Sequence, residues 1–180
     1  MSIKLISCVI SCYNEEENIP VLLNQIKKNN LEKNFEFIIV NNGSTDNSWK
    51  IICEKKSSFP EIKFINIEED LGWGNGITQG LKYVTSDFVG WIHGDLQYDL
   101  KILLKVYELL KDPNNRHDNI LIKGRREKRK FSDAIFTFLM SIIASVLTGK
   151  IMYDINAQPN FFSKNLLKEF ENTPKDLMLD

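Results

Sequence analysis

The sequence has little cysteine, histidine or proline. Its 180 residues include three cysteines, two histidines and five prolines. The cysteines are Cys8, Cys12 and Cys53; their odd number and the lack of a C-x-x-C pair argue against a disulfide framework. Cys8 and Cys12 lie in or beside an apolar strand pattern, where buried structural thiols are common. We therefore expect a protein of a reducing, cytosolic compartment.

Long hydrophobic runs are also lacking. The longest uncharged stretch, residues 134–149, has sixteen residues, fewer than the ~20 that a membrane-spanning helix needs. The apolar stretch at the start is short and runs into Glu15-Glu16-Glu17 without a small-residue cleavage site, so we expect no signal peptide. The apolar pattern of residues 176–180 stops in mid-element, which is typical of a chain cut short at its carboxyl end.

Excess charge of one sign is absent. The net charge of −1 lacks the basic excess typical of nucleic-acid-binding proteins, and we expect no nucleic-acid partner. The charge is unevenly spread, because residues 123–130 hold six cations in eight positions. Such a run is either a solvated loop or a patch for anions or a membrane surface, and the pattern alone leaves both open.

Apolar runs alternate with helical patterns along most of the chain. This order predicts an α/β fold with a mostly parallel sheet and helices on both faces. The length fits one domain, residues 1–180, with a turn near Asp112-Pro113 dividing residues 1–112 from residues 113–180. The predicted strands are Ile3–Ser11, Phe35–Asn41, Ile62–Ile67, Phe88–Ile92 and Ile120–Lys123. The predicted helices are Ile19–Lys28, a segment ending at Lys56, Asn75–Val84 and Leu100–Lys111.

A carboxylate follows the fourth predicted strand. His93-Gly94-Asp95-Leu96-Gln97 comes directly after the buried pattern of Phe88–Ile92. Ligands bind at the carboxyl edge of open α/β sheets, so Asp95 lies where a divalent cation meets a phosphate-bearing substrate. For His93, a structural role at the strand end is the alternative.

Polar segments follow the other predicted strands too. Tyr13-Asn14-Glu15 can grip a base or ribose, or can simply start a helix with acidic residues. Asn42, with both a donor and an acceptor on its side chain, suits a nucleobase edge, and Ser44 follows it in the same segment; the alternative is an ordinary strand–turn–helix sequence. The third segment, residues 70–76, holds Gly72 and Asn75; its glycines allow close approach of the backbone to a ligand.

Together these segments resemble family 2 glycosyltransferases of the GT-A fold, and within them the polyprenyl-phosphate sugar transferases, which are similar to dolichol-phosphate mannose synthase. The matching segments are residues 9–16, 39–46, 72–80 and 94–97, and the resemblance covers roughly residues 3–165. It implies a nucleotide-diphospho-sugar site at the carboxyl strand ends, with Mg²⁺ or Mn²⁺ bound at Asp95. The binding residues that it implies are Tyr13, Asn14, Glu15, Asn42, Ser44, Gly72, Asn75, His93, Gly94, Gln97, Arg125 and Arg126.

Four positions depart from the family pattern. Ser11 stands where proline is usual, and Asn41-Asn42 stand where two aspartates are usual. His93 replaces the first acid of the D-x-D motif, and Asp95 keeps the second. A neutral imidazole can bind a metal or hydrogen-bond a ribose, so His93 is the second candidate metal ligand, in a less negative site.

The acceptor side is expected in residues 113–180. The resemblance assigns Arg125 and Arg126 to a diphosphate or lipid phosphate, which the planar guanidinium fits. It assigns Asp154 a catalytic role beside the sugar, unless this residue only forms a turn before Pro159. Residues 134–148 form a broadly apolar predicted helix, either an interfacial membrane helix or one packed in the core or against a partner.

The resemblance implies an inverting glycosyltransferase that moves a hexose from a nucleotide-diphospho-sugar to a polyprenyl phosphate. Such an enzyme would be cytoplasmic and peripheral at the inner face of the membrane. An ionised lipid phosphate would need no strong general base. Two alternatives remain: a transferase that acts on a glycan or lipid-linked oligosaccharide, and a nucleotide-sugar-binding module without turnover.

Overall fold

The computed structural model describes residues 6–70, 72–115, 120–124, 141 and 157–170, and within them six strands form one sheet. The strands are β1 (Ile6–Cys12), β2 (Phe35–Asn42), β3 (Lys63–Ile67), β4 (Phe88–His93), β5 (Leu121–Lys123) and β6 (Asn160–Ser163). The α-helices are α1 (Asn18–Lys28), α2 (Ser48–Lys55), α3 (Trp73–Leu81) and α4 (Ile102–Lys111). Short 3₁₀ helices are η1 (Leu31–Lys33), η2 (Lys56–Ser58), η3 (Pro113–Asn115) and η4 (Lys164–Phe170).

The sheet has the strand order β3-β2-β1-β4-β6-β5. The pairs β3–β2, β2–β1 and β1–β4 are parallel, whereas β6 runs antiparallel to both β4 and β5. The predicted α/β fold with a mostly parallel sheet is therefore confirmed. The antiparallel β6 was not predicted, because four residues are too few for a reliable periodic pattern.

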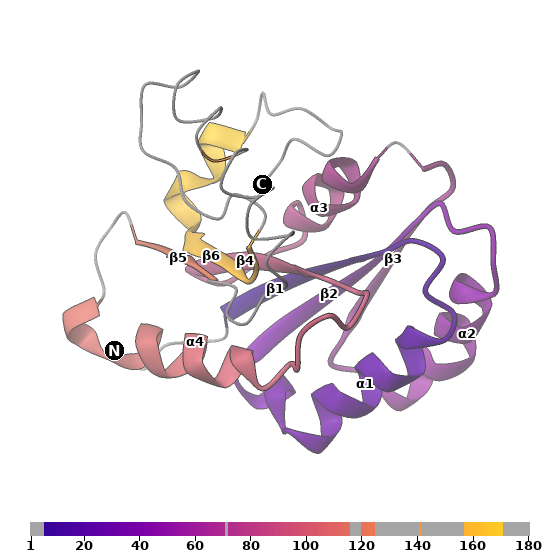
Figure 1. Cartoon of the computed structure of the whole chain (residues 1–180), viewed down its shortest axis with the longest axis horizontal. Helices are drawn as coiled ribbons and strands as arrows, with labels where there is room; N and C mark the ends of the chain where they lie inside the picture. Colours follow the sequence, from indigo (N-terminus) through magenta and orange to yellow (C-terminus); the bar gives the residue numbers. More distant parts are fainter. Residues whose placement is uncertain (1–5, 71, 116–119, 125–140, 142–156, 171–180) are drawn as a thin grey trace.

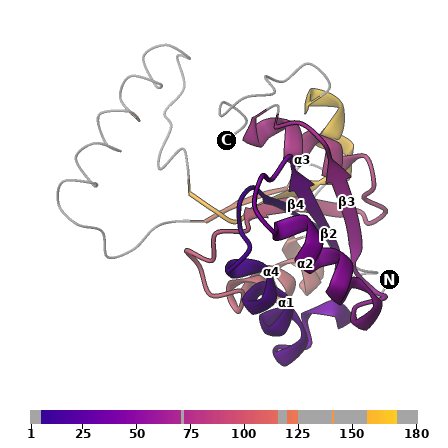
Figure 2. The ribbon, with the colours of Figure 1, turned by 90° about the vertical axis from the view of Figure 1, so that its right-hand side faces the viewer.

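Helices cover both faces of the sheet, as Figures 1 and 2 show: α1, α2 and α4 lie on one face and α3 lies on the other. Two separate hydrophobic clusters fill the two interfaces. In β1, Cys8 and Ile10 join the cluster under α1 and α4, whereas Val9 joins the cluster under α3. The alternation follows from the two-residue period of a strand.

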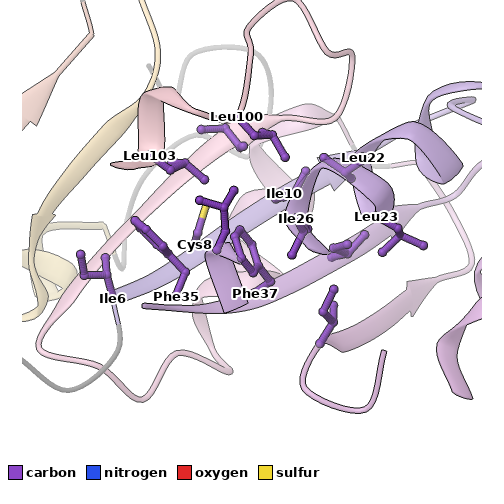
Figure 3. Close-up of a cluster of buried hydrophobic side chains, with 14 of the residues drawn as sticks. Ile6, Cys8, Ile10, Leu22, Leu23, Ile26, Phe35, Phe37, Leu100 and Leu103 are labelled. Carbon is purple, nitrogen blue, oxygen red and sulfur yellow. The ribbon is translucent and has the colours of Figure 1, made fainter. Parts of the chain in front are cut away.

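The larger cluster joins the central strands to α1 and α4 (Figure 3). Phe35 and Phe37 of β2 lie with their ring centroids 5.8 Å apart, and Phe161 of β6 meets Phe35 at 6.1 Å. Because Phe161 and the neighbouring Phe162 enter opposite clusters, β6 is built into the core on both faces. The described part of residues 113–180 thus shares one sheet with residues 6–112.

No helix among the described residues is long and apolar enough to cross a membrane. The predicted interfacial helix 134–148 lies outside the described residues, apart from Ser141, which is in a helix.

Candidate active site

A cleft of about 350 Å³ lies at the carboxyl ends of β1, β2 and β4, beside the loop from β3 to α3. This volume is within the range of small-molecule sites, roughly 300–1,000 Å³. Seven of its lining residues are among those that the sequence predicts: Tyr13, Glu15, Asn42, Gly72, His93, Gly94 and Asp95. The cleft therefore brings together the ends of three strands that lie far apart in the chain.

The turn after β4 lies directly against the end of β1. Ser11 is in register with His93, and the Gly94 amide donates to the Ser11 carbonyl at 3.2 Å. A Cβ atom on Gly94 would lie 2.6 Å from the Cys12 sulfur, too close for any other residue without a shift. Gly94 thus allows the close contact that places Asp95 at the cleft.

The backbone around Asp95 is held by hydrogen bonds on both sides. The amide of Gln97 donates to Asp95 Oδ1 at 3.1 Å, while the exposed Gln97 side chain is not part of the cleft lining. The backbone amide of His93 donates to Oε1 of Gln158 at 2.7 Å. The imidazole of His93 packs against the indole of Trp73 in a tilted arrangement, with ring centroids 4.4 Å apart and an angle of 34° between the ring planes. These contacts hold the backbone on both sides of Asp95 in place.

Asn14 and Ser44 connect the loops after β1 and β2 and are not part of the cleft lining. Asn14, at φ 55°, accepts the Thr45 amide at 2.8 Å through its side-chain oxygen, and its own amide donates to Ser44 Oγ at 3.0 Å. The amide of Glu15 donates to Ser48 Oγ at 2.8 Å. These bonds hold Tyr13 and Glu15 in place at the cleft.

Glu15 lies in an acidic part of the site. Burial is the main factor that raises the pKa of its carboxyl group, and the nearby charges of Asp95 and Asp46 raise it further. A hydrogen bond from the side chain of Asn18, at 2.5 Å, acts in the opposite direction. A cation bound in the cleft would offset this accumulation of negative charge.

Asn42 is almost fully buried, with 1% of its surface exposed. Its Nδ2 donates to Asp70 Oδ1 at 2.9 Å and to the Gly72 carbonyl at 3.1 Å. Asn75, predicted to bind the nucleotide sugar, is buried in the first turn of α3 and is not part of the cleft lining; its Oδ1 accepts from Gln79 at 3.3 Å. Its Nδ2 is buried without a hydrogen-bond partner among the described residues, and its role in binding stays a prediction.

Helix α3 approaches the ends of β1 and β2 closely. A Cβ atom on Gly76 would lie 2.3 Å from Ser11 Oγ and 3.1 Å from the amide carbon of Asn42. Gly80, one turn later, lies in the same way against Val9 and Val40. The spacing of these two glycines lets α3 lie near the sheet and form one wall of the site.

Three lining residues were not predicted: Ser11, Asp70 and Trp73. Ser11 was noted only as a departure from the family pattern, and the other two lie within the glycine-rich segment after β3. Ser11 is at the end of β1, and Asp70 and Trp73 lie in or beside the loop that follows β3, so their places near the carboxyl edge of the sheet are a signal that could have identified them. Of the predicted site residues, Arg125, Arg126 and Asp154 lie outside the described residues, and their roles stay predictions.

The described residues contain no group of three or more metal-binding side chains. Asp95 and His93 still fit a magnesium or manganese ion, because such ions are often held by one or two protein ligands together with substrate phosphates. The half-buried carboxylate of Asp95 is a hard oxygen donor of the required kind.

The mostly parallel sheet, the helices on both faces and the cleft at the strand ends together make up a GT-A fold, which similar solved structures of glycosyltransferases also have. The mannosyltransferase PcManGT from Pyrobaculum calidifontis, solved with GDP-Man and Mn²⁺, superimposes with a TM-score of 0.66 over 95% of this chain and 48% of its own, at 17% identity. Glucosyl-3-phosphoglycerate synthase from Mycobacterium tuberculosis, solved with Mn²⁺ and UDP-Glc, has a TM-score of 0.67 over 91% of this chain and 57% of its own, at 17% identity.

The profile of glycosyl transferase family 2 matches residues 7–133, and the chain belongs to this family. A dolichol-phosphate mannosyltransferase of Pyrococcus furiosus is 28% identical over 107 residues, 59% of this chain and 30% of that protein. A poly-beta-1,6-N-acetyl-D-glucosamine synthase of Staphylococcus aureus is 34% identical over 94 residues, 52% of this chain and 22% of that protein. The match thus spans less than a third of each relative's length. The predicted family is confirmed.

Proposed function

We propose that this chain is an inverting glycosyltransferase that transfers a hexose from a nucleotide-diphospho-sugar to a polyprenyl phosphate at the cytoplasmic face of a membrane. The observation that carries the proposal is the cleft at the carboxyl strand ends, with Asp95 in its wall. Similar proteins solved with GDP-Man or UDP-Glc and Mn²⁺ support a nucleotide-sugar donor and a divalent cation. The dolichol-phosphate mannosyltransferase of P. furiosus supports the lipid acceptor.

Each strand end has its own part in this proposal. Tyr13, Glu15 and Asn42, on one side of Asp95, hold the nucleoside. Asp95, with His93 beside it, binds the Mg²⁺ or Mn²⁺ ion, which when bound neutralises the charge that builds on the departing diphosphate. Turnover needs the departing diphosphate to be held in line with the attacking acceptor. The hydrogen bond from the Gly94 amide to the Ser11 carbonyl restrains the turn that carries Asp95 and so helps to hold the diphosphate in this position.

The acceptor side of the proposal depends on residues outside those described. Arg125 and Arg126 hold a phosphate group, and Asp154 orients the sugar or the attacking group. The acceptor phosphate is ionised at neutral pH, so its oxygen attacks the anomeric carbon without a strong general base. Helix 134–148 and its basic flank lie on the membrane surface, where each cation adds roughly 1 kcal/mol of attraction to an anionic leaflet.

A second candidate is a glycan acceptor. It is favoured by the similarity to the poly-beta-1,6-N-acetyl-D-glucosamine synthase of S. aureus, whose product is a polysaccharide. The donor side of the site would be the same in both cases, because only the attacking group differs.

The donor test is sugar transfer from radiolabelled UDP-glucose, UDP-N-acetylglucosamine and GDP-mannose, with Mn²⁺ and with EDTA. Polyprenyl phosphate in vesicles and soluble glycan oligomers serve as separate acceptors. We expect a labelled lipid product with Mn²⁺ only. Labelled glycan would favour the second candidate, and donor binding without any product would reduce the chain to a binding module.

The membrane test is co-sedimentation with anionic and neutral vesicles. Wild type is compared with a variant in which Arg125, Arg126, Lys128, Arg129 and Lys130 are neutralised. We expect wild type to prefer anionic vesicles and to be released by salt, because screening shortens the reach of the attraction. Equal binding to both kinds of vesicle, or no binding, would remove the main sequence support for a lipid acceptor.

A further inference from the structure

The turn that carries Asp95 is held from two sides by successive backbone amides. The amide of Gly94 donates to the Ser11 carbonyl of β1 at 3.2 Å. The amide of His93 donates to Oε1 of Gln158, just before β6, at 2.7 Å. Because β4 lies between β1 and β6 in the sheet, the end of this strand is held on both of its sides.

The bond from His93 to Gln158 stands where pairing of the two strands has ended. The register of β4 with β6 pairs Trp91 with Asn160, the first residue of β6. Two residues further along β4 and two residues back from β6, the same register puts Gln158 opposite His93. Between Gln158 and β6 stands Pro159, which has no N–H to donate to a strand ladder. The side-chain oxygen of Gln158 thus supplies an acceptor at the end of β4 that lies beyond the strand pairing.

Gln158 is buried, with 3% of its surface exposed. Because the His93 amide is a donor, the oxygen of the Gln158 side chain faces it and the nitrogen is on the other side. This nitrogen, Nε2, is buried without a hydrogen-bond partner among the described residues. An unpaired buried donor costs stability, and an apolar side chain at this position would avoid the cost. Stability alone therefore explains a glutamine here poorly.

We propose that Gln158 is a positioning residue for the turn His93-Gly94-Asp95. By holding the His93 amide, it fixes the backbone from which Asp95, two residues later, reaches the cleft. The inference rests on the proposed function, because it requires a divalent cation at Asp95. It gives residues 113–180, the half of the chain expected to bind the acceptor, a part in metal binding on the donor side.

Loss of the Gln158 oxygen should affect the metal more than the nucleoside. Tyr13, Glu15 and Asn42, the residues proposed to hold the nucleoside, lie in or after β1 and β2, and neither strand pairs with β6. Loss of a group that orients a metal ligand typically lowers metal affinity or activity roughly 10- to 100-fold. The metal-dependent part of nucleotide binding is therefore the quantity to measure.

Three variants separate positioning from folding. Gln158→Met keeps the length of the side chain, but its sulfur is only a weak acceptor. Gln158→Glu keeps an oxygen at the same reach and is the conservative rescue. Ser163→Ala is the matched control, because the buried Ser163 Oγ likewise accepts a backbone amide, that of Ile120, at 3.2 Å. Ser163 is at the other end of β6, opposite Phe88 at the start of β4.

The first measurement needs no metal. Hydrogen exchange followed by NMR reports the protection of single amides in the free protein. We expect the His93 amide to exchange about tenfold faster in Gln158→Met than in the wild type, and at the wild-type rate in Gln158→Glu. Ser163→Ala should speed exchange at Ile120 and leave His93 unchanged. Wild-type protection of the His93 amide in Gln158→Met would overturn the inference.

The second measurement separates the metal from the nucleotide. Calorimetry gives the affinities for UDP and GDP with Mn²⁺ and with EDTA, and their ratio measures the contribution of the metal. For the nucleotide that binds the wild type more tightly, we expect Gln158→Met to lower this ratio about tenfold, with the affinity in EDTA unchanged. Gln158→Glu and Ser163→Ala should keep the wild-type ratio.

The outcomes distinguish the inference from the proposed function. A wild-type ratio in Gln158→Met, or a loss of affinity that is equal in EDTA, would overturn the inference and leave the proposed function intact. An equal loss of the ratio in Gln158→Glu would show that packing matters and the acceptor oxygen does not, which also contradicts it. A wild type that binds neither nucleotide, or binds them equally with and without Mn²⁺, would overturn the proposed metal-dependent function and the inference together.

Discussion

The two ends of the sheet hold carboxylates in opposite electrostatic situations, the buried Glu36 at one end and the partly buried Glu15 at the other. At the amino ends of the strands, Glu36 accepts from Ser7 at 2.5 Å, from Lys63 at 2.6 Å and from the Thr85 amide at 2.9 Å. Burial favours a higher pKa for Glu36, but these hydrogen bonds outweigh it and hold the pKa below its usual value. At the carboxyl ends, burial and neighbouring acids raise the pKa of Glu15.

The difference shows what each end contributes. The Glu36 cluster satisfies its carboxylate within the protein and joins three strands and the segment before β4, so it stabilises the fold. The cleft leaves Asn42 Oδ1 and Trp73 Nε1 without partners and gathers Glu15 and Asp95, which costs stability. Such a cost is typical of a site that completes its interactions with a ligand.

The largest expected effect comes from Asp95→Asn, which changes only the cleft. Because a divalent cation stabilises the departing diphosphate by several kcal/mol, we expect turnover to fall at least about 100-fold, with little change in the unfolding midpoint. The control is Glu61→Gln, which also removes one negative charge, but at an exposed position before β3. We expect this control to keep full activity. Normal turnover by Asp95→Asn, or undiminished wild-type activity in EDTA, would contradict the assignment.

Glu36→Gln tests the opposite end. Loss of the charge weakens the hydrogen bonds from Lys63 and Ser7, and we expect the free energy of unfolding to fall by about 2 kcal/mol. The effect is not larger because Lys63 is partly exposed and its charge is screened by water. Urea denaturation measures this loss. The affinity for the donor nucleotide is expected to stay the same. A variant as stable as the wild type would show that the cluster is not a stabilising element.

The same cluster predicts a dependence of stability on pH. The folded-state pKa of Glu36 lies below its usual value of 4.5, so its stabilisation is present above pH 4.5 and is lost as the pH falls through the folded-state pKa. The stability difference between wild type and Glu36→Gln should therefore shrink in acid. Urea midpoints at pH 7, 5 and 3.5 measure it; a constant difference would refute this origin.

The smallest effect is expected from Glu15→Gln, and its sign is opposite. The folded-state pKa of Glu15 lies above 4.5, so the ionised carboxylate at neutral pH costs stability. Glutamine removes the charge and can still accept from Asn18, so unfolding should become harder by a few tenths of a kcal/mol. Donor binding should weaken in the same variant. A lower melting temperature at pH 7 would contradict this reading of the site.

Much of the site could be predicted from local sequence. Asp95 directly follows a buried strand, and in a parallel sheet that position is at the ligand-binding edge. Tyr13, Glu15 and Asn42 follow the same rule for β1 and β2. The structure places all four at one cleft, because the registers of β1 with β2 and with β4 align the strand ends.

The partners of these residues could not be predicted. Gln158 binds the backbone of His93 from 65 residues away, and Asp70 binds Asn42 across 28 residues. The side-chain oxygen of Asn14 accepts from the loop after β2, a contact that the sequence did not predict, and the binding role of Asn14 stays a prediction. A polar side chain at a strand end has the same local pattern whether it faces a ligand or a neighbouring loop.

The sequence by itself determined the four parallel strands, the helices that follow them and the edge of the sheet where the chemistry is expected, because burial periodicity is a local property of the chain. Only the tertiary structure decided which polar atoms are satisfied and which remain for a ligand. Hydrogen bonds between loops depend on distances across the sheet, such as the 2.9 Å between Asn42 and Asp70. Those distances arise only when β1, β2, β4 and α3 pack together.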